Sequence, residues 1–162
     1  MPPVIAHGDL HSGNMMWKLD ESGGVTNEVL AVFDWQEYHE GSPMEDIARI
    51  LTFCCNGCTR REAEEFIFDF YLEQLTKEMK EVGKEAPYTL DQVKKAYNYM
   101  YLTQAYGLIM IPNFLQEFFK NDSPGLKQAK IDTVILRCKH ALEDMKRLFD
   151  GEMKDVYDKY EQ

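Results

Sequence analysis

The chain has 162 residues, of which 44% are hydrophobic, and carries a formal net charge of −10. A chain of this length typically forms one domain and buries about 70% of the surface that its unfolded form exposes, which argues against disorder. The acidic balance argues against a nucleic-acid partner, because nucleic-acid binding requires a basic face. It would suit a cationic substrate, although a solubilising surface explains the same charge.

The cellular location is indicated by the apolar runs and the cysteines. No apolar run approaches the roughly 20 residues of a membrane span, and residues 1–4 lack the basic and apolar regions of a signal peptide. Three of the four cysteines are crowded together, which suits a reduced cytosolic chain. Cys55 and Cys58 form a CxxC pair, but no second pair supplies the four ligands of a structural zinc site. We therefore expect a cytoplasmic protein with no membrane contact and no metal at these cysteines.

The first 35 residues carry the strand signals. Residues 4–6 form a short apolar run, and residues 15–19 and 29–33 are better strand candidates. Between them, residues 20–24 (Asp-Glu-Ser-Gly-Gly) have the composition of a turn. The pattern predicts an antiparallel hairpin over residues 14–34.

The rest of the chain carries helix signals. Ser42-Pro43 followed by Glu45, Thr59 with Glu62, and Thr89 with Gln92 are all typical of helix starts, and a fourth helix is expected after Ser123-Pro124. Apolar residues recur with a helical period after each start. Those of the second to fourth helices are Ala63, Phe66, Ile67, Phe70 and Tyr71; Leu90, Val93, Tyr97, Tyr101 and Leu108; and Ile131, Val134, Ile135, Cys138, Leu142, Met145 and Phe149. We expect helices over most of residues 43–149, with these stripes in the core.

Polar residues whose side chains could take part in catalysis or bind a metal lie at the two ends of the predicted hairpin. Residues 7–14 (His-Gly-Asp-Leu-His-Ser-Gly-Asn) precede it and residues 34–36 (Asp-Trp-Gln) follow it. Because a hairpin returns the chain to its starting point, Asp34 should lie beside Asn14 and close to Asp9. Phosphoryl transfer needs a carboxylate to orient the acceptor hydroxyl and oxygen ligands for magnesium, so this set of residues suits that reaction.

The segment H-G-D-x-x-x-x-N, followed by a hydrophobic strand and D-W, resembles the catalytic loop and metal-binding segment of aminoglycoside phosphotransferases and choline kinases. Protein kinases have a related motif with the same spacing between Asp and Asn. Residues 41–49 and 87–90 further resemble the CHK kinase-like, or ecdysteroid kinase-like, group. The resemblance implies an α+β, mainly helical fold: the C-terminal lobe of a protein-kinase-like fold, with a small hairpin that carries the catalytic and metal segments.

The resemblance also implies a role for each matching residue. Asp9 would be the catalytic base or would position the acceptor hydroxyl. Asn14 and Asp34 would bind Mg²⁺ together with ATP. Three residues would support the site: His7 within the loop, Trp35 beneath the nucleotide, and Asp46 as an anchor of the loop.

The resemblance divides the chain into a kinase-like lobe over residues 1–150 and a polar tail over residues 151–162. Only six residues precede His7, whereas the ATP-binding lobe of a kinase needs about 80–100, so we expect that lobe to be absent from this chain. The chain alone would then not turn over ATP. Its uncovered cleft face, with Trp35 and the neighbouring strand residues, would favour self-association.

The acceptor and the class of protein have alternatives. Choline, an aminoglycoside, a steroid alcohol and another small hydroxyl compound all fit the resemblance as acceptors. A catalytically inactive kinase-like binding module would keep the same motif. The triplet His7-x-Asp9-x-His11 is also typical of a binuclear metallophosphoesterase, but such a site needs further ligands, and only His39 and His140 remain.

Overall fold

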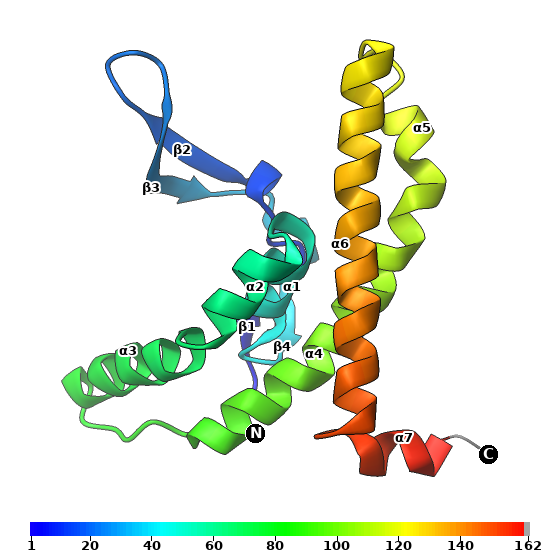
Figure 1. Ribbon diagram of the computed structural model, residues 1–162. Coiled ribbons are helices and arrows are strands. Elements are labelled where there is room, and N and C mark those ends of the chain that lie inside the picture. The colour runs from blue at the N-terminus through cyan, green and yellow to red at the C-terminus, as the bar shows by residue number, and fades with distance from the viewer. Residues whose placement is uncertain (161–162) are drawn as a thin grey trace.

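A computed structural model describes residues 1–160, apart from the side chains of residues 113 and 116. Within them the chain is mainly helical, with two small antiparallel sheets (Figure 1). The elements are, in chain order, β1 (Val4–Ala6), η1 (Ser12–Asn14), β2 (Met15–Leu19), β3 (Val25–Val32), η2 (Trp35–Glu37), β4 (His39–Gly41), α1 (Glu45–Cys54), α2 (Gly57–Glu64), α3 (Ile67–Glu81), α4 (Leu90–Met110), η3 (Ile111–Phe114), α5 (Leu115–Phe118), α6 (Pro124–Asp150) and α7 (Lys154–Tyr160).

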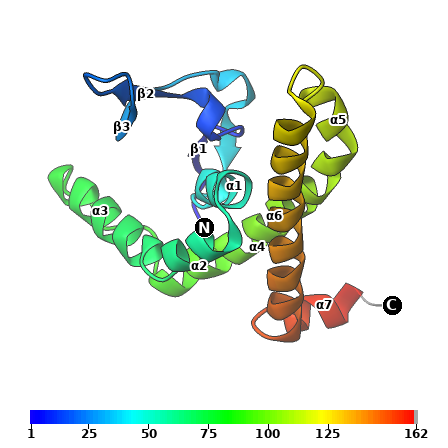
Figure 2. The same cartoon turned by 45° about the horizontal axis from the view of Figure 1, so that its top comes forward.

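The predicted hairpin is present as β2 and β3, which project from the helical body in both ribbon views (Figures 1 and 2). Met15 pairs with Val32, so the two ends of the hairpin meet. The turn depends on Asp20, whose Oδ1 accepts hydrogen bonds from the backbone N–H groups of Ser22 and Gly24 at 2.8 and 2.9 Å. The second strand begins at Val25 rather than at residue 29, because this tight turn closes early.

A second sheet closes the loop on its other side. β1 pairs antiparallel with β4, with Ala6 opposite His39. The short apolar run at residues 4–6 is therefore a strand. Its partner, residues 39–41, has no sequence pattern typical of a strand. The two sheets bracket residues 7–14 between them.

Helix starts differ in how well their local signals predicted them. The Thr89 and Gln92 capping box forms as expected at the start of α4. Ser42 instead makes a turn before α1, which begins at Glu45: its Oγ accepts the N–H of Met44 at 3.2 Å. The proposed box at Thr59 is wrong, because Asn56 caps α2 by accepting the N–H of Thr59 at 3.0 Å.

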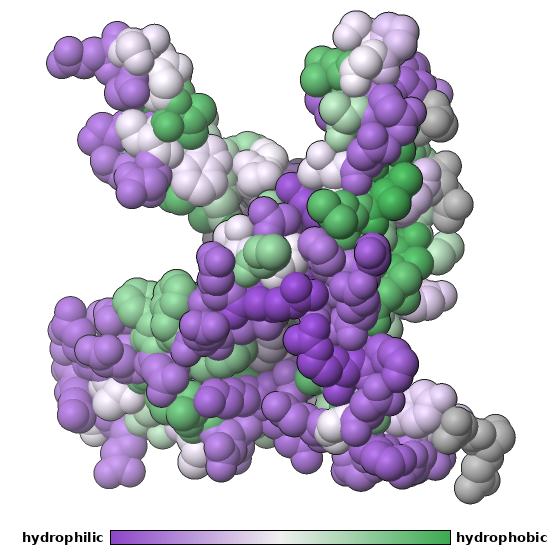
Figure 3. Space-filling view, in the orientation of Figure 1, coloured by the Kyte–Doolittle hydropathy of each residue, from purple (hydrophilic) through white to green (hydrophobic). Residues whose placement is uncertain are grey.

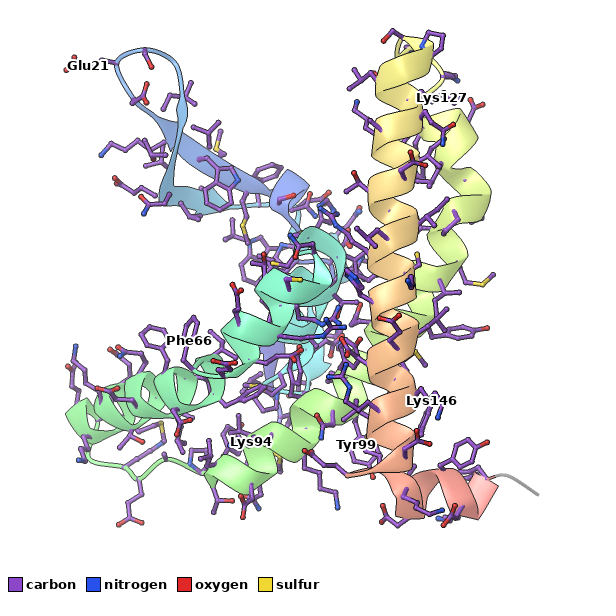
Figure 4. All side chains as sticks on the ribbon, viewed as in Figure 1. Glu21, Phe66, Lys94, Tyr99, Lys127 and Lys146 are labelled. Atoms are coloured by element: carbon purple, nitrogen blue, oxygen red, sulfur yellow. The ribbon has the colours of Figure 1, made fainter. Side chains whose placement is uncertain are left out.

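The core is built around α4, which contacts α1, α3 and α6. Its predicted stripe is buried, apart from the partly buried Leu90 at its start. The stripe expected after Thr59 is interrupted, since α2 ends at Glu64 and α3 starts anew at Ile67. That break changes the helical phase, so Phe66 is 59% exposed and projects into solvent (Figure 4). Phe70 is exposed as well.

The stripe of α6 is only partly covered. Ile131 and Cys138 are buried, whereas Ile135 and Leu142 are exposed. Figure 3 shows hydrophobic surface along α6 and the neighbouring α5. Residues 151–160, expected as a polar tail, instead turn back into α7: Met153 is buried, and the rings of Phe149 and Tyr157 lie 5.3 Å apart. No helix among residues 1–160 is long and apolar enough to cross a membrane.

Candidate active site

The loop of residues 7–14 is shaped by a close backbone contact at Gly8. Its φ is +83°, a left-handed conformation that side chains rarely adopt, and a Cβ atom there would lie 2.4 Å from the carbonyl oxygen of Glu37. Glycine therefore lets the loop lie directly against the segment that joins the hairpin to β4.

The carboxylate of Asp46, in the first turn of α1, binds the start of the loop. Oδ2 accepts the backbone N–H of His7 at 2.7 Å, and Oδ1 accepts that of Gly8 at 3.1 Å. Hydrogen bonds to a charged acceptor are the stronger kind, so one side chain fixes two successive peptide groups. These are the contacts that an anchor of the loop requires.

The ring of His7 is buried and bonded at both nitrogens. Nε2 lies 2.9 Å from the carbonyl oxygen of Phe33, and Nδ1 lies 3.3 Å from the backbone nitrogen of Asp9. Since Phe33 offers only an acceptor and Asp9 only a donor, the pair of contacts selects the tautomer with hydrogen on Nε2. The ring also packs against Trp35, with ring centroids 4.7 Å apart. His7 thus joins the loop to Phe33 and Trp35, the residues on either side of Asp34.

Asp9 and Asn14 are brought together. The Nδ2 group of Asn14 donates to the backbone carbonyl of Asp9 at 3.0 Å and lies 3.5 Å from its Oδ2. This contact orients the buried amide group of Asn14, and its Oδ1 has no hydrogen-bond donor among the described residues. An oxygen ligand is therefore available at residue 14.

Asp34 is placed beside Asn14 by the backbone. The N–H of Phe33 donates to the carbonyl of Asn14 at 3.1 Å, which sets residue 34 one position beyond the end of the hairpin. Asp34 has φ +63° and ψ +57°, the left-handed region that aspartate tolerates better than most residues. Its carboxylate takes part in no hydrogen bond or ion pair within residues 1–160, so no contact joins it to Asp9 or Asn14. A left-handed residue next to polar groups of a loop is typical of functional sites.

Arg49 contacts the loop as well, although the motif assigns it no role. Its Nη2 forms an ion pair with Oδ1 of Asp9, and its Nη1 donates to Oε1 of Gln104 at 3.2 Å. A signal existed: residues three apart share a helix face, so a helix that presents Asp46 to the loop also presents Arg49.

The remaining residues of the loop make fewer contacts. Nε2 of His11 lies 3.7 Å from Oδ2 of Asp9, and its Nδ1 accepts the N–H of Gly13 at 3.0 Å. The N–H of Ser12 donates to the sulfur of Cys54 at 3.2 Å. Among residues 1–160, no group of three or more His, Cys, Asp or Glu side chains is arranged to hold a metal ion, whether at His11 or at the cysteines.

A second polar cluster joins α2, α4 and α6. Arg60, with only 1% of its side chain exposed, pairs with Asp144, and Arg61 and Arg147 bind the same carboxylate at 3.0 and 2.7 Å. Tyr97 donates to Oε1 of Glu64 at 2.5 Å. Burial raises the pKa of Glu64, against the opposing effects of Tyr97 and Arg60. All of these residues except Arg60 line a pocket of about 290 Å³, and no residue of the loop of residues 7–14 lines it.

Comparison with known proteins identifies the family. The family model DUF1679, described as "Uncharacterized oxidoreductase dhs-27", matches residues 1–153, so the chain belongs to this family. A Caenorhabditis elegans protein of the same name, "Uncharacterized oxidoreductase dhs-27", is 35% identical over 113 residues, which make up 68% of this chain and 14% of that protein. A second protein from the same organism, "Uncharacterized kinase-like protein D1044.1", is 26% identical over 155 residues, or 90% of this chain and 38% of that protein.

The matched segments thus span well under half the length of either relative. No solved structure shows a significant match to the chain. The chain is similar to one protein with a kinase-like name and to another with an oxidoreductase name.

Proposed function

We propose that this member of the family is the catalytic half of an ATP-dependent phosphotransferase of the aminoglycoside phosphotransferase and choline kinase class, acting on a hydroxyl group of a small molecule. The observation that carries the proposal is the arrangement of the loop. Its backbone is bound by Asp46, its aspartate and asparagine are hydrogen-bonded to each other, and Asp34 follows directly after the hairpin. The kinase-like name of one relative agrees with it.

The residues present fit a magnesium ion bound with ATP. Magnesium prefers oxygen ligands, and Oδ1 of Asn14 and the carboxylate of Asp34 have no competing donors among residues 1–160. When bound, the ion would neutralise charge on the transferred phosphoryl group. In this proposal Asn14 and Asp34 are its protein ligands.

Asp9 would supply the acid–base chemistry. A carboxylate at this position accepts the proton of the acceptor hydroxyl or holds that hydroxyl in line with the phosphoryl group. His7 would support the geometry of the loop rather than react, since its Nε2 is committed to the carbonyl of Phe33 at 2.9 Å. Trp35 would pack under the nucleotide from its place against His7; its indole N–H donates to the carbonyl of Val32 at 3.1 Å.

The chain has fewer features of an oxidoreductase, the activity that the name of the other relative gives. Dinucleotide-binding folds use a parallel sheet with a Gly-rich turn of the pattern G-x-G-x-x-G. Both sheets within residues 1–160 are antiparallel and two-stranded, and the pattern does not occur in the sequence. Since the matched residues make up only 14% of that protein, its name describes a much longer chain.

The test is transfer of the γ-phosphoryl group from labelled ATP to a panel of choline, aminoglycosides and steroid alcohols in the presence of Mg²⁺. The catalyst is this chain joined to an ATP-binding lobe, which is called the full-length protein below. We expect Asp9→Asn to lower turnover by about 100-fold or more with nucleotide binding retained, the usual scale for a lost general base. Asp34→Asn should instead weaken binding of the magnesium nucleotide. Asp132→Asn, on the exposed side of α6, is the matched control and should leave both quantities unchanged.

Three outcomes separate the alternatives. Transfer that is lost in Asp9→Asn and kept in Asp132→Asn supports the phosphotransferase. Nucleotide binding without transfer to any acceptor supports a kinase-like binding module. Transfer that survives Asp9→Asn at full rate contradicts the role of the loop.

A further inference from the structure

We propose that Arg49 is a positioning residue for Asp9 and that Gln104 of α4 holds Arg49 in place. The inference rests on the proposed function and deepens it, because it explains how one oxygen of the catalytic aspartate is kept available for the acceptor. It begins with the two contacts of the guanidinium group. Nη2 bonds to Oδ1 of Asp9, and Nη1 bonds to Oε1 of Gln104 at 3.2 Å.

The guanidinium group is held in a single orientation. It is planar and rigid, so fixing Nη1 on Gln104 also fixes the direction of Nη2. Its third support is the ring of Phe53, whose centroid lies 4.8 Å from Cζ. Lysine would not reproduce this stacking, nor a planar group that bonds to two residues at once.

Gln104 is an unusual acceptor because it is buried in the core helix. Its side chain is only 8% exposed, and its neighbours Tyr101, Ala105 and Leu108 belong to the hydrophobic core. A buried polar side chain costs free energy unless it is hydrogen-bonded, and the bond to Arg49 meets that requirement. The helix around which the core is built is thereby connected to the loop through one arginine.

The two oxygens of Asp9 have different surroundings. Oδ1 takes the close ion pair with Arg49, whereas the contacts of Oδ2 are longer, 3.5 Å to Nδ2 of Asn14 and 3.7 Å to Nε2 of His11. Binding of Oδ1 prevents the carboxylate from rotating, so Oδ2 stays on the side of Asn14. That oxygen is the one a hydroxyl acceptor would meet.

Asp46 and Arg49 therefore act as a pair on one face of α1. Asp46 fixes the backbone at the start of the loop, and Arg49 fixes the carboxylate two residues later. A merely structural ion pair at this degree of exposure, about a quarter for each side chain, would contribute little. The positioning role is distinguishable from it because it predicts a change in kcat rather than in stability.

The first experiment needs no activity. Arginine side-chain NMR of the full-length protein should resolve separate Nη1 and Nη2 signals for Arg49, because the two bonds hinder rotation of the guanidinium group. The signals should merge in Gln104→Leu and in Asp9→Asn. Merged signals in the wild-type protein would mean that Arg49 is not held, which overturns the proposal whatever the protein catalyses.

The second experiment measures phosphoryl transfer by the full-length protein. We expect Arg49→Ala to lower kcat by about tenfold or more, with KM for ATP changed less than about twofold, a loss that belongs to the transition state. Added guanidinium ion should restore part of the rate. Arg49→Lys should restore little, and Gln104→Leu should show a smaller loss of the same kind. Arg147→Lys changes an exposed arginine of α6 that lies outside the loop of residues 7–14 and its contacts, so it is the control and should keep full activity.

The outcomes are separable. An unchanged kcat in Arg49→Ala overturns the proposal, as does a loss that follows the melting temperature and is not rescued by guanidinium. Absence of transfer by the wild-type protein rejects the proposed function and the role of Arg49 in it. The NMR result would then still decide whether Gln104 holds the arginine.

Discussion

The carboxylate of Asp46 accepts the backbone N–H of His7 at 2.7 Å, although 39 residues separate the two in sequence. The same side chain accepts the N–H of Gly8. A helix start and a loop are thus joined by a single charged group, and the position of the loop relative to the helical body depends on it.

Replacing Asp46 by alanine should destabilise the fold by about 2–4 kcal/mol, because two partly buried N–H groups lose a charged acceptor. Asp46→Asn should cost less, since one oxygen can still accept. The measurement is urea unfolding of each variant at neutral pH.

Glu45→Gln is the matched control for this change. It removes a negative charge from the same first turn of α1, and so the same favourable interaction with the helix dipole, but no bond to the loop. A loss in Glu45→Gln as large as that in Asp46→Ala would show that the dipole rather than the loop explains the effect.

Gly8→Ala should be more harmful than Gly23→Ala by at least about 1 kcal/mol. Both glycines have φ near +80°, so both substitutions carry the cost of a left-handed alanine. Only at residue 8 would the new methyl group also meet a backbone atom, 2.4 Å from the carbonyl oxygen of Glu37, whereas Gly23 has open space around it. Thermal unfolding of the two variants gives the comparison directly; equal losses would mean that the loop can move away from residue 37.

Local signals in the sequence were enough to predict the hairpin and the start of α4. The turn at residues 20–24 and the capping box of Thr89 and Gln92 each depend on residues within a few positions of one another. The order of the motif likewise placed Asn14 and Asp34 at the two ends of the hairpin, and these ends meet because a hairpin returns to its start.

Contacts between distant residues were not predictable in this way. Arg60 lies in a polar stretch that resembles a solvated helix face, yet it is buried because Asp144, 84 residues later, neutralises it. The pairing of β1 with β4, the break between α2 and α3 and the bond from Arg49 to Gln104 also depend on tertiary packing. Only the last had a partial signal, since Arg49 shares a helix face with Asp46.

The pKa of His39 should lie above its ordinary value of 6.5, and the stability of the fold should depend on the protonation of this ring. The hydrogen bond from Nδ1 to the carbonyl of Glu37, at 2.9 Å, is the main cause of the raised pKa, and the carboxylate of Glu45, at 3.2 Å from Nε2, adds to it. The ring can donate from both nitrogens at once only when it is protonated. The resulting stabilisation is fully present below about pH 6.5 and is lost as the pH rises through the higher pKa of the folded state.

NMR titration of the His39 ring measures its pKa. The melting temperatures of wild type and His39→Gln between pH 5.5 and 8.5 measure the stabilisation that depends on it. The two melting curves should differ most at low pH and converge at high pH. In Glu45→Gln the pKa of His39 should fall only partly, because the bond to Glu37 remains. A complete return to the ordinary value would assign the shift to Glu45 instead.

Asp144→Asn should be among the most destabilising conservative changes in the chain, at about 3 kcal/mol, because the buried guanidinium of Arg60 then keeps only the longer ion pair with Glu64, at 3.4 Å. Glu143→Gln is its neighbour and control: that carboxylate is half exposed and its ion pairs are 3.8 and 3.9 Å long, so the cost should stay below about 0.5 kcal/mol. Adding Arg60→Met to Asp144→Asn should recover part of the loss, because the buried charge that Glu64 alone neutralises poorly is removed. Urea unfolding of the wild type, the single variants Asp144→Asn and Arg60→Met, and the double variant completes the double-mutant cycle. Losses that simply add would show that Arg60 does not depend on Asp144, and that the other two arginines account for the effect of residue 144.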